Sequence, residues 1–583
     1  MSVKKARASL PGPATPAQAA IAFERRAHTA TAAATVLAYS GRIDDRELLL
    51  AGSSPAERDA SDEELLLARY RRLGERFLDD VRGTYAVALF DAVASRVLAA
   101  RDVMGGRLAS YVLRDDLFAV AVGPGGPSRL LALPGVSGEL DRFRLAEYFA
   151  FDELSGPSSY FRDVRLLLPG EMLIVDRSSV THRWLPGPSL SLRVEPATWE
   201  EGVEQLAERL ATAVERAIGE HRHLAVWVSG GLDSTPVAAL AARLLPSCAP
   251  DATLHGISWR ISDSAGDERA FVDAFSRASG VAISWVDCDD ALPFSRLADW
   301  PVHPDGPDQT GYRWFHERSY TRARELGTTL VLNGFGGDSL YADARRWLWT
   351  LLLASGPGAA IDRLREVARR DGWPRALRHE VVGALLPKAR RLRRPLPTWL
   401  SAEARELLTG RGRWPPGLRA ARRPRQAERV LSLIDGEGDA IESWYAARHG
   451  LEVSVPLRDQ DLAQYVLAVP DHFLQQGVES RIALRHAIRG LVPEEVRRRT
   501  DKARFRQVLL RGLVPDRLRW GGPLLRSPEA LWRGFVQPAA VDRWLAGDVR
   551  DDSDRVGLLQ CLFAELWRFT RAGGELGSLA AGG

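Results

Sequence analysis

The stretch Val226-Trp227-Val228-Ser229-Gly230-Gly231-Leu232-Asp233-Ser234-Thr235 joins a strand, a turn and the start of a helix in one short segment. Residues 223–228 form the apolar run expected of a short buried strand. Residues 234–245 are rich in Ala and Leu, and they predict a helix that tolerates Pro236 in its first turn. The segment therefore predicts a strand–loop–helix unit of an α/β protein.

Between this strand and helix the sequence predicts an anion-binding loop. Gly230 and Gly231 permit a tight turn whose N–H groups point inward, and the helix N-terminus adds the positive end of a dipole. Asp233 would repel a polyphosphate unless a divalent cation lay between them, so it predicts Mg²⁺. The loop is not a Walker loop, because the chain contains no Gly-Lys pair. The residues expected to line the phosphate site are Val228, Ser229, Gly230, Gly231, Leu232, Asp233 and Ser234.

The motif Ser-Gly-Gly-Leu-Asp-Ser at residues 229–234 resembles the signature loop of the ATP pyrophosphatase (PP-loop) superfamily. Members of that superfamily cleave ATP between its α and β phosphates. The resemblance implies that the chain uses ATP together with Mg²⁺.

Strands and helices alternate beyond this loop. Such alternation predicts a doubly wound parallel sheet with helices on both faces, whose ligands lie at the carboxyl ends of the strands. Strands are expected at residues 253–259, 283–287 and 329–332, and helices from residue 267 and over residues 313–326.

A second glycine-rich loop, Asn333-Gly334-Phe335-Gly336-Gly337-Asp338, follows the last of these strands. Because both loops leave the same edge of the predicted sheet, Asp338 is expected to be the second carboxylate on the Mg²⁺ bound by Asp233. The residues that complete the expected ATP and pyrophosphate site are Ser258, Asn333, Gly334, Gly336 and Gly337.

The composition is that of a globular protein with more than one domain. The chain has 583 residues, of which 45% are hydrophobic and 26% charged, and its formal net charge is +4. No apolar run has the length of a membrane span, and no signal-peptide core begins the sequence, so a cytoplasmic location is expected. Cys248, Cys288 and Cys561 have no metal-ligand spacing and are expected to be reduced thiols. The basic run at residues 388–394 is interpreted as a solvated face, and no nucleic-acid partner is expected.

The N-terminal third predicts a separate α+β layer domain. Residues 1–20 are expected to be a disordered tail, residues 21–190 a domain of short strands and helices, and the Pro-rich segment around residues 186–196 its boundary. Several motifs of this domain resemble the glutaminase (Ntn-type) domain of asparagine synthetase: Ser40-Gly41-Arg42-Ile43, Ser61-Asp62-Glu63, residues 81–86, Phe90-Asp91 and Arg101-Asp102.

That family uses an N-terminal Cys to attack glutamine and an Asn-Gly pair in its oxyanion hole. Here position 2 is Ser2, no Cys precedes Cys248, and Ser40 stands where the Asn belongs. A Ser without an activating base does not replace a thiolate. The domain is therefore expected to be a degenerate amidotransferase that serves as scaffold, and glutamine is not expected to be the nitrogen source.

Residues 197–583 are expected to form the synthetase domain, with a large helical C-terminal part after residue 339. Residues 448–459 and 481–505 again resemble asparagine synthetase. The resemblance implies that Lys502 contacts the ATP phosphates during adenylation, where a cation would stabilise developing charge. Asp233, Asp338 and Lys502 are thus the expected catalytic residues of an enzyme that forms an acyl-adenylate and then an amide.

The position of Phe335 narrows the expected substrate. Asparagine synthetases carry Glu there and β-lactam synthetases Tyr, whereas Phe cannot move a proton. A peptide α-amine, with a reference pKa of about 7.7 to 8.0, needs a strong base less than an alkyl amine does. Possible residues of the substrate or base region are Phe335, Asp439, Glu442 and Glu452.

These departures resemble lasso-peptide macrolactam synthetases, which join a peptide's N-terminal amine to an internal Asp or Glu side chain. The resemblance implies a precursor core peptide as substrate, and a leader-peptide-binding protein and a leader peptidase as partners. A threaded peptide needs an extensive binding surface. Candidates for that surface are Arg345, Trp347 and Trp349.

Three other functions stay open at this point. A β-lactam synthetase-like ligase would act on a small amino acid, and an asparagine synthetase-like enzyme would use ammonia. A degenerate synthetase would only bind a partner. Asp233, Asp338 and Lys502 favour catalysis over that last alternative.

Overall fold

The computed structural model describes most of the chain outside its N-terminal segment. The predicted disordered tail lies outside the described residues, except that Ala19 and Ala20 begin the first strand. The described residues are 19–24, 35–50, 60–151, 156–248, 251–262, 267–341, 347–377, 381, 396–409, 420–435, 438–476, 479–501 and 505–581.

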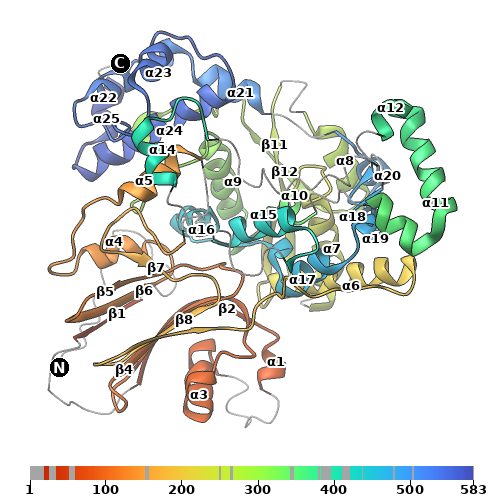
Figure 1. The fold of residues 1–583 in the computed structure, drawn as a ribbon, viewed down its shortest axis with the longest axis horizontal. Helices are drawn as coiled ribbons and strands as arrows, with labels where there is room; N and C mark the ends of the chain where they lie inside the picture. The colour runs from red at the N-terminus through yellow and green to blue at the C-terminus, as the bar shows by residue number, and fades with distance from the viewer. Residues whose placement is uncertain are drawn as a thin grey trace.

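The N-terminal part forms a sandwich of two antiparallel sheets, at lower left in Figure 1. One sheet has the order β2-β3-β4-β8-β9 and the other the order β1-β6-β5-β7. Helices α3 (Asp62–Leu73) and α4 (Gly126–Leu131) pack on the outer faces of the first and second sheets. The predicted α+β layered sandwich is therefore confirmed. The strands are β1 (Ala19–Glu24), β2 (Thr35–Asp44), β3 (Arg82–Asp91), β4 (Arg96–Arg101), β5 (Ala109–Leu113), β6 (Leu117–Val122), β7 (Arg165–Leu166), β8 (Glu171–Val175) and β9 (Val180–Trp184).

Strand β3 shows how the sequence builds these layers. Successive side chains of a strand point to opposite faces. Ala86 and Phe90 lie in the core between the sheets, and Tyr85 and Leu89 lie in the core under α3. Because both faces are covered, the strand is an almost continuous apolar run in the sequence.

The second domain contains a five-stranded parallel sheet of order β12-β11-β10-β13-β14. In β10, Leu224 and Val226 belong to the core shared with α6, α7 and α8, whereas Ala225 and Trp227 belong to the core shared with α9. Helices thus cover both faces, as predicted for a doubly wound sheet. The elements are α6 (Trp199–Ile218), β10 (His223–Trp227), α7 (Ser234–Cys248), β11 (Thr253–Arg260), α8 (Arg269–Ser279), β12 (Ala282–Asp287), α9 (Arg313–Glu325), β13 (Leu330–Leu332) and β14 (Glu452–Ser454).

The rest of this domain is mainly helical, and Figure 1 shows α11 and α12 projecting from one side. Helix α24 packs against the N-terminal sandwich, since Gln560 Nε2 donates to Tyr148 O at 2.5 Å. The remaining elements are α1 (Arg46–Leu49), α5 (Arg142–Phe149), α10 (Gly337–Leu340), α11 (Trp347–Asp371), α12 (Trp373–Ala376), α14 (Ala402–Thr409), α15 (Pro424–Asp435), α16 (Gly438–Arg448), α17 (Gln460–Ala468), α18 (Asp471–Leu474), β15 (Gln475–Gln476), β16 (Glu479–Ser480), α19 (Ile482–Ala487), α20 (Glu494–Arg497), α21 (Arg506–Gly512), α22 (Gly521–Arg526), α23 (Pro538–Leu545), α24 (Asp552–Arg571) and α25 (Leu576–Ala581).

In the part of the chain that the structure describes, none of these helices combines the length and the apolar composition needed to cross a bilayer.

Candidate active site

Two glycine-rich loops meet at the carboxyl edge of the parallel sheet. Loop 1 (residues 228–234) joins β10 to α7, and loop 2 (residues 333–338) joins β13 to α10. β10 and β13 are adjacent and parallel, so both loops leave the sheet at the same edge. A Cβ on Gly334 would lie 2.6 Å from Ser234 N, and one on Gly337 would lie 2.0 Å from an Asp233 carboxylate oxygen. Glycine is required at both positions because the loops pack directly on each other.

Loop 1 is held in shape by its own hydrogen bonds and by one distant arginine. Ser229 N donates to Ser234 Oγ at 3.0 Å, and the two hydroxyl oxygens lie 2.9 Å apart. Gly230 has a φ of +63°, which favours glycine. The buried Arg499 donates to Ser229 O at 3.2 Å and to Glu268 at 2.8 Å. The loop is thus preorganised for the anion that its N–H groups and hydroxyls suit.

The carboxylates of the two loops converge on one cation, the guanidinium of Arg481. Its Nη1 lies 2.6 Å from Asp233 Oδ1, and its Nη2 donates to Asp338 Oδ1. Burial lowers the pKa of Arg481, but the charges of Asp233 and Asp338 raise it more, so its net direction is upward. We call these three residues the outer cluster. Asp338 is the member of the outer cluster that is most open to solvent, with 61% of the Asp338 side chain exposed.

This donor set fits Mg²⁺. Two carboxylate oxygens that reach one guanidinium can also reach one divalent ion, which would complete its shell with phosphate and water oxygens. Among the described residues no group of three or more His, Cys, Asp and Glu could hold a metal instead. Asp233 and Asp338 are the residues that would hold such an ion.

An aromatic wall borders the loops. Phe335 of loop 2 is 38% exposed, and its ring centroid lies 5.7 Å from that of Trp227 and 6.1 Å from that of His316. The His316 ring stacks on Trp259 at 5.8 Å. The aromatic wall consists of Trp227, Trp259, Tyr312, Phe315, His316, Phe335 and Phe505. Trp227, Phe315 and His316 are buried in it, and Phe335 is its exposed member.

The other residues predicted for ATP binding lie at the same edge. Val228 N donates to Ile257 O at 2.9 Å, which places Val228 where β10 ends. Ser258 is buried in β11 beside it. Asn333 is also buried, and its side-chain oxygen accepts from Phe335 N at 3.0 Å, so it shapes loop 2. Their contacts with ATP stay predictions.

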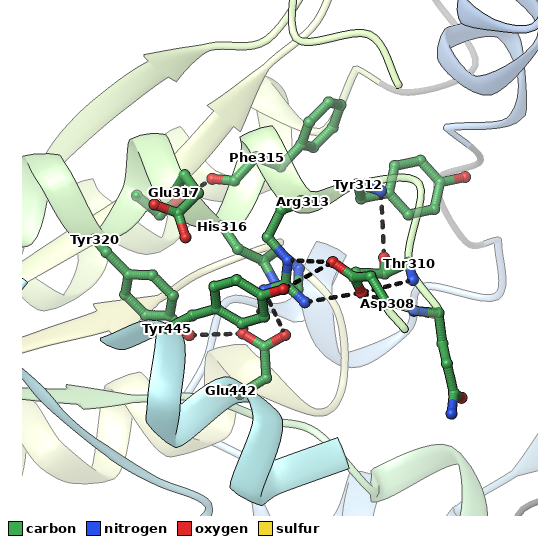
Figure 2. Close-up of polar contacts among 12 residues, drawn as sticks. Asp308, Thr310, Tyr312, Arg313, Phe315, His316, Glu317, Tyr320, Glu442 and Tyr445 are labelled. Carbon is green, nitrogen blue, oxygen red and sulfur yellow. Dashed lines mark hydrogen bonds and ion pairs between the residues drawn. The ribbon is translucent and has the colours of Figure 1, made fainter. Parts of the chain in front are cut away.

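Glu442, one of the bases considered from the sequence, lies in a buried polar network that we call the inner cluster (Figure 2). Arg313 donates to Glu442 at 2.9 Å, and Tyr320 OH donates to the same carboxylate at 2.8 Å. His316 Nδ1 lies 3.1 Å from that carboxylate. Burial raises the pKa of Glu442, but the charge of Arg313 and the hydrogen bonds of His316 and Tyr320 hold it well below its usual range. These partners hold Glu442 ionised, and its part in the reaction stays a prediction. The inner cluster comprises Asp308, Arg313, His316, Tyr320, Glu442 and Tyr445.

Two residues expected in the substrate region, Glu452 and Trp347, do not lie there. Glu452 starts β14 and pairs in register with Leu330, so it lies at the amino edge of the sheet, opposite the loops. There it contacts His221 at 3.2 Å and lines a cavity of about 970 Å³ against the N-terminal sandwich. Trp347 is fully buried in the core of α11 and does not offer a peptide surface.

Some predicted residues cannot be placed. Lys502 and Arg345 lie outside the described residues, and so does the side chain of Asp439, whose backbone belongs to α16. Trp349, from the same segment as Trp347, is partly buried in α11. Arg481 and His316 were not predicted as site residues, because neither belongs to a local motif near the loops.

The sequence matches two family models. Residues 205–568 match the model described as asparagine synthase, and residues 30–185 match the model described as glutamine amidotransferase domain. The fold is accordingly an Ntn-type amidotransferase sandwich followed by a PP-loop domain with a large helical part. The first match covers more than half of the chain, so this protein belongs to the asparagine synthase family.

Named relatives agree with this assignment. The chain is 24% identical over 485 residues to asparagine synthetase [glutamine-hydrolyzing] 3 of Bacillus subtilis. The matched region covers 79% of this chain and 73% of the relative. It is 27% identical over 303 residues to amidase chyE of Penicillium rubens, covering 48% and 43%. A putative asparagine synthetase of Mycobacterium bovis is 29% identical over 202 residues, covering 32% and 29%. The chain thus spans less than half the length of two of these three relatives.

Proposed function

We propose that this protein is an ATP-dependent amide-forming ligase. It activates a carboxylate as an acyl-adenylate with release of pyrophosphate, and an amine then displaces AMP. The observation that carries the proposal is the convergence of Asp233 and Asp338, from two loops, on one cation position at the mouth of a preorganised anion-binding loop. Membership of the asparagine synthase family supports the same reaction class.

Each part of the site has a chemical task in this reaction. Loop 1 orients the phosphates through its N–H groups and the hydroxyls of Ser229 and Ser234. Asp233 and Asp338 hold Mg²⁺, which neutralises phosphate charge when bound. The aromatic wall excludes water beside the reacting carboxylate, which protects an acyl-adenylate from hydrolysis. Lys502 is assigned, from the family resemblance, to charge that develops on the α-phosphate.

The amide is proposed to be the isopeptide bond of a lasso peptide. In this proposal the substrate is a precursor core peptide, and its internal Asp or Glu side chain is closed onto its N-terminal amine. The exposed ring of Phe335, at 38%, offers a peptide substrate an apolar contact at loop 2. Phe335 supports an amine that needs no acidic or phenolic group in loop 2. A leader-peptide-binding protein and a leader peptidase are the proposed partners.

The test offers purified protein and Mg-ATP two sets of substrates. One set is aspartate with ammonia, and the other is leaderless peptides with N-terminal Gly and a nearby internal Asp or Glu. We expect AMP and a peptide that is lighter by one water. AMP with free amino acids only would instead assign the protein to the small-molecule ligases. The absence of AMP with every substrate would favour a degenerate partner-binding protein.

A further inference from the structure

The amine that attacks the acyl-adenylate must lose a proton, and loop 2 offers no group that can take it. Phe335 carries no titratable atom, and Asp338 is bound by Arg481. His316 is the titratable side chain of the aromatic wall whose ring lies nearest to Phe335, with centroids 6.1 Å apart. Its ring also lies 5.0 Å from Trp227 at the end of β10, where loop 1 begins. The imidazole thus packs against one aromatic ring from loop 2 and one from the strand that leads into loop 1.

The inner cluster fixes the orientation of this imidazole. His316 Nδ1 lies 3.1 Å from Glu442 Oε2, and the ring is stacked on Trp259 with an interplanar angle of 17°. A carboxylate on Nδ1 holds the proton there, so the other nitrogen, Nε2, carries the lone pair. Within the described residues Nε2 makes no hydrogen bond, and it does not belong to the fully buried polar atoms without a partner. Nε2 is thus not completely enclosed, in a side chain that is 9% exposed.

Glu442 can perform this role because its own position is fixed. Arg313, itself 1% exposed, donates to Glu442 at 2.9 Å and to Asp308 at 2.9 Å, and its guanidinium lies 3.5 Å from the ring centroid of Tyr445. Tyr320 OH gives Glu442 a further hydrogen bond at 2.8 Å. The carboxylate therefore stays ionised and still, and it can stabilise an imidazolium that forms beside it.

We propose that His316, oriented by Glu442, is the general base of amide formation in this protein. This inference rests on the proposed function. The amine nitrogen attacks the carbonyl carbon and forms the C–N bond. The carbonyl carbon–oxygen bond to the phosphate breaks, and AMP leaves with that electron pair. The proton of the attacking nitrogen passes to Nε2 of His316, and the resulting imidazolium returns it to solvent.

Other groups near the wall are less suited to accept the proton. Tyr320 is fully buried with its OH bound to Glu442, and burial and the Glu442 charge raise its pKa. Burial raises the pKa of Tyr312 to about 12, so it stays protonated. Glu442 accepts hydrogen bonds from two other residues besides its contact with His316. Among these groups His316 alone combines a fixed orientation with an acceptor atom that has no partner among the described residues.

The test compares His316→Gln with His449→Gln. His449 is a matched control, because it directly follows α16 and its Nε2 pairs with Glu317 of α9 at 2.9 Å. Two steps are measured separately: peptide-dependent exchange of pyrophosphate into ATP, which reports adenylation, and formation of the closed peptide. For H316Q we expect exchange within about threefold of wild type and closure slower by about 10²- to 10⁴-fold. For H449Q we expect both rates to be unchanged.

Closure by H316Q at the wild-type rate would overturn the inference, and so would an equal loss of exchange and closure in a folded variant. If H316Q does not fold, Glu442→Gln carries the test. It should keep exchange and slow closure, and an unchanged closure rate would overturn the inference. If wild-type protein shows no peptide-dependent exchange, the proposed function fails rather than the role of His316.

Discussion

The outer and inner clusters both pair one arginine with two carboxylates, and they differ in how open they are to solvent. In the outer cluster Arg481 bridges Asp233 and Asp338, and 61% of the Asp338 side chain is exposed. In the inner cluster Arg313 bridges Asp308 and Glu442, whose side chains are 5% and 11% exposed. The same ion-pair chemistry therefore serves two purposes. Carboxylates that are open to solvent can exchange the arginine guanidinium for another cation. Buried carboxylates keep their guanidinium, and the ion pair fixes the side chains around it.

The largest effect is expected from the outer carboxylates. Asp233→Asn and Asp338→Asn should each lower the rate of AMP formation by at least about 10³-fold, because a metal ion contributes several kcal/mol to charge stabilisation. Their thermal unfolding should stay close to that of wild type. AMP formation at the wild-type rate in either variant would contradict the assignment of Mg²⁺ to these two residues.

A large loss of stability is expected from the inner arginine. Arg313→Met leaves Asp308 and Glu442 buried without their cation, which should lower the free energy of unfolding by about 3–5 kcal/mol. The measurement is denaturant unfolding, with Arg481→Met as the control. That control should cost less, because the Asp338 side chain is 61% exposed, whereas Arg481 and Asp233 are 14% and 21% exposed. Equal losses would remove the distinction between the two clusters.

The same comparison has a pH dependence. Because the folded pKa of Glu442 is lowered, its contribution to stability is complete above its unfolded value of about 4.3 and is lost as the pH falls below it. In Arg313→Met the buried Glu442 lacks its cation and takes up a proton at a higher pH than in wild type, so the difference in stability between the two proteins should shrink as the pH falls. A difference that does not change with pH would show that Arg313 does not hold Glu442 ionised.

The smallest effect concerns competition between Arg481 and Mg²⁺ for the outer carboxylates. Arg481→Gln leaves Asp233 and Asp338 facing each other, so Mg²⁺ without ATP should bind several-fold more tightly than to wild type, equivalent to about 1 kcal/mol. The measurement is the rise of the unfolding temperature with Mg²⁺ concentration. An identical rise in both proteins would show that Arg481 and Mg²⁺ do not share a site.

The sequence predicted the parts of the site that a local motif encodes. Loop 1 and loop 2 each follow a strand, and their glycines and aspartates stand in short, readable patterns, so their convergence followed from the parallel sheet. Arg481 lies 248 positions from Asp233, and Glu442 lies 126 positions from His316. No periodicity links residues at such separations, so these pairs become visible only in the folded chain.

Two errors have equally physical reasons. β14 has three residues, too few to show the alternation that identifies a strand, and its direction decides at which edge Glu452 lies. Trp347 opens an amphipathic helix, and the sequence does not show which face of an isolated helix is covered. Both residues were therefore assigned to a substrate surface that they do not form.

Adjacent strands β13 and β14 are separated in sequence by loop 2 and by helices α10 to α16, so this whole region leaves the sheet and returns to it. Its ends are joined by backbone hydrogen bonds, from Asn333 N to Ser454 O at 3.2 Å and from Glu452 N to Thr329 O at 2.9 Å. The entropy of closing such a segment grows with the logarithm of its length, about 0.6 kcal/mol for each doubling. Insertions and deletions in α11 and α12 therefore cost the sheet little stability. Evolution can lengthen or replace this part of the protein while loops 1 and 2 stay as they are.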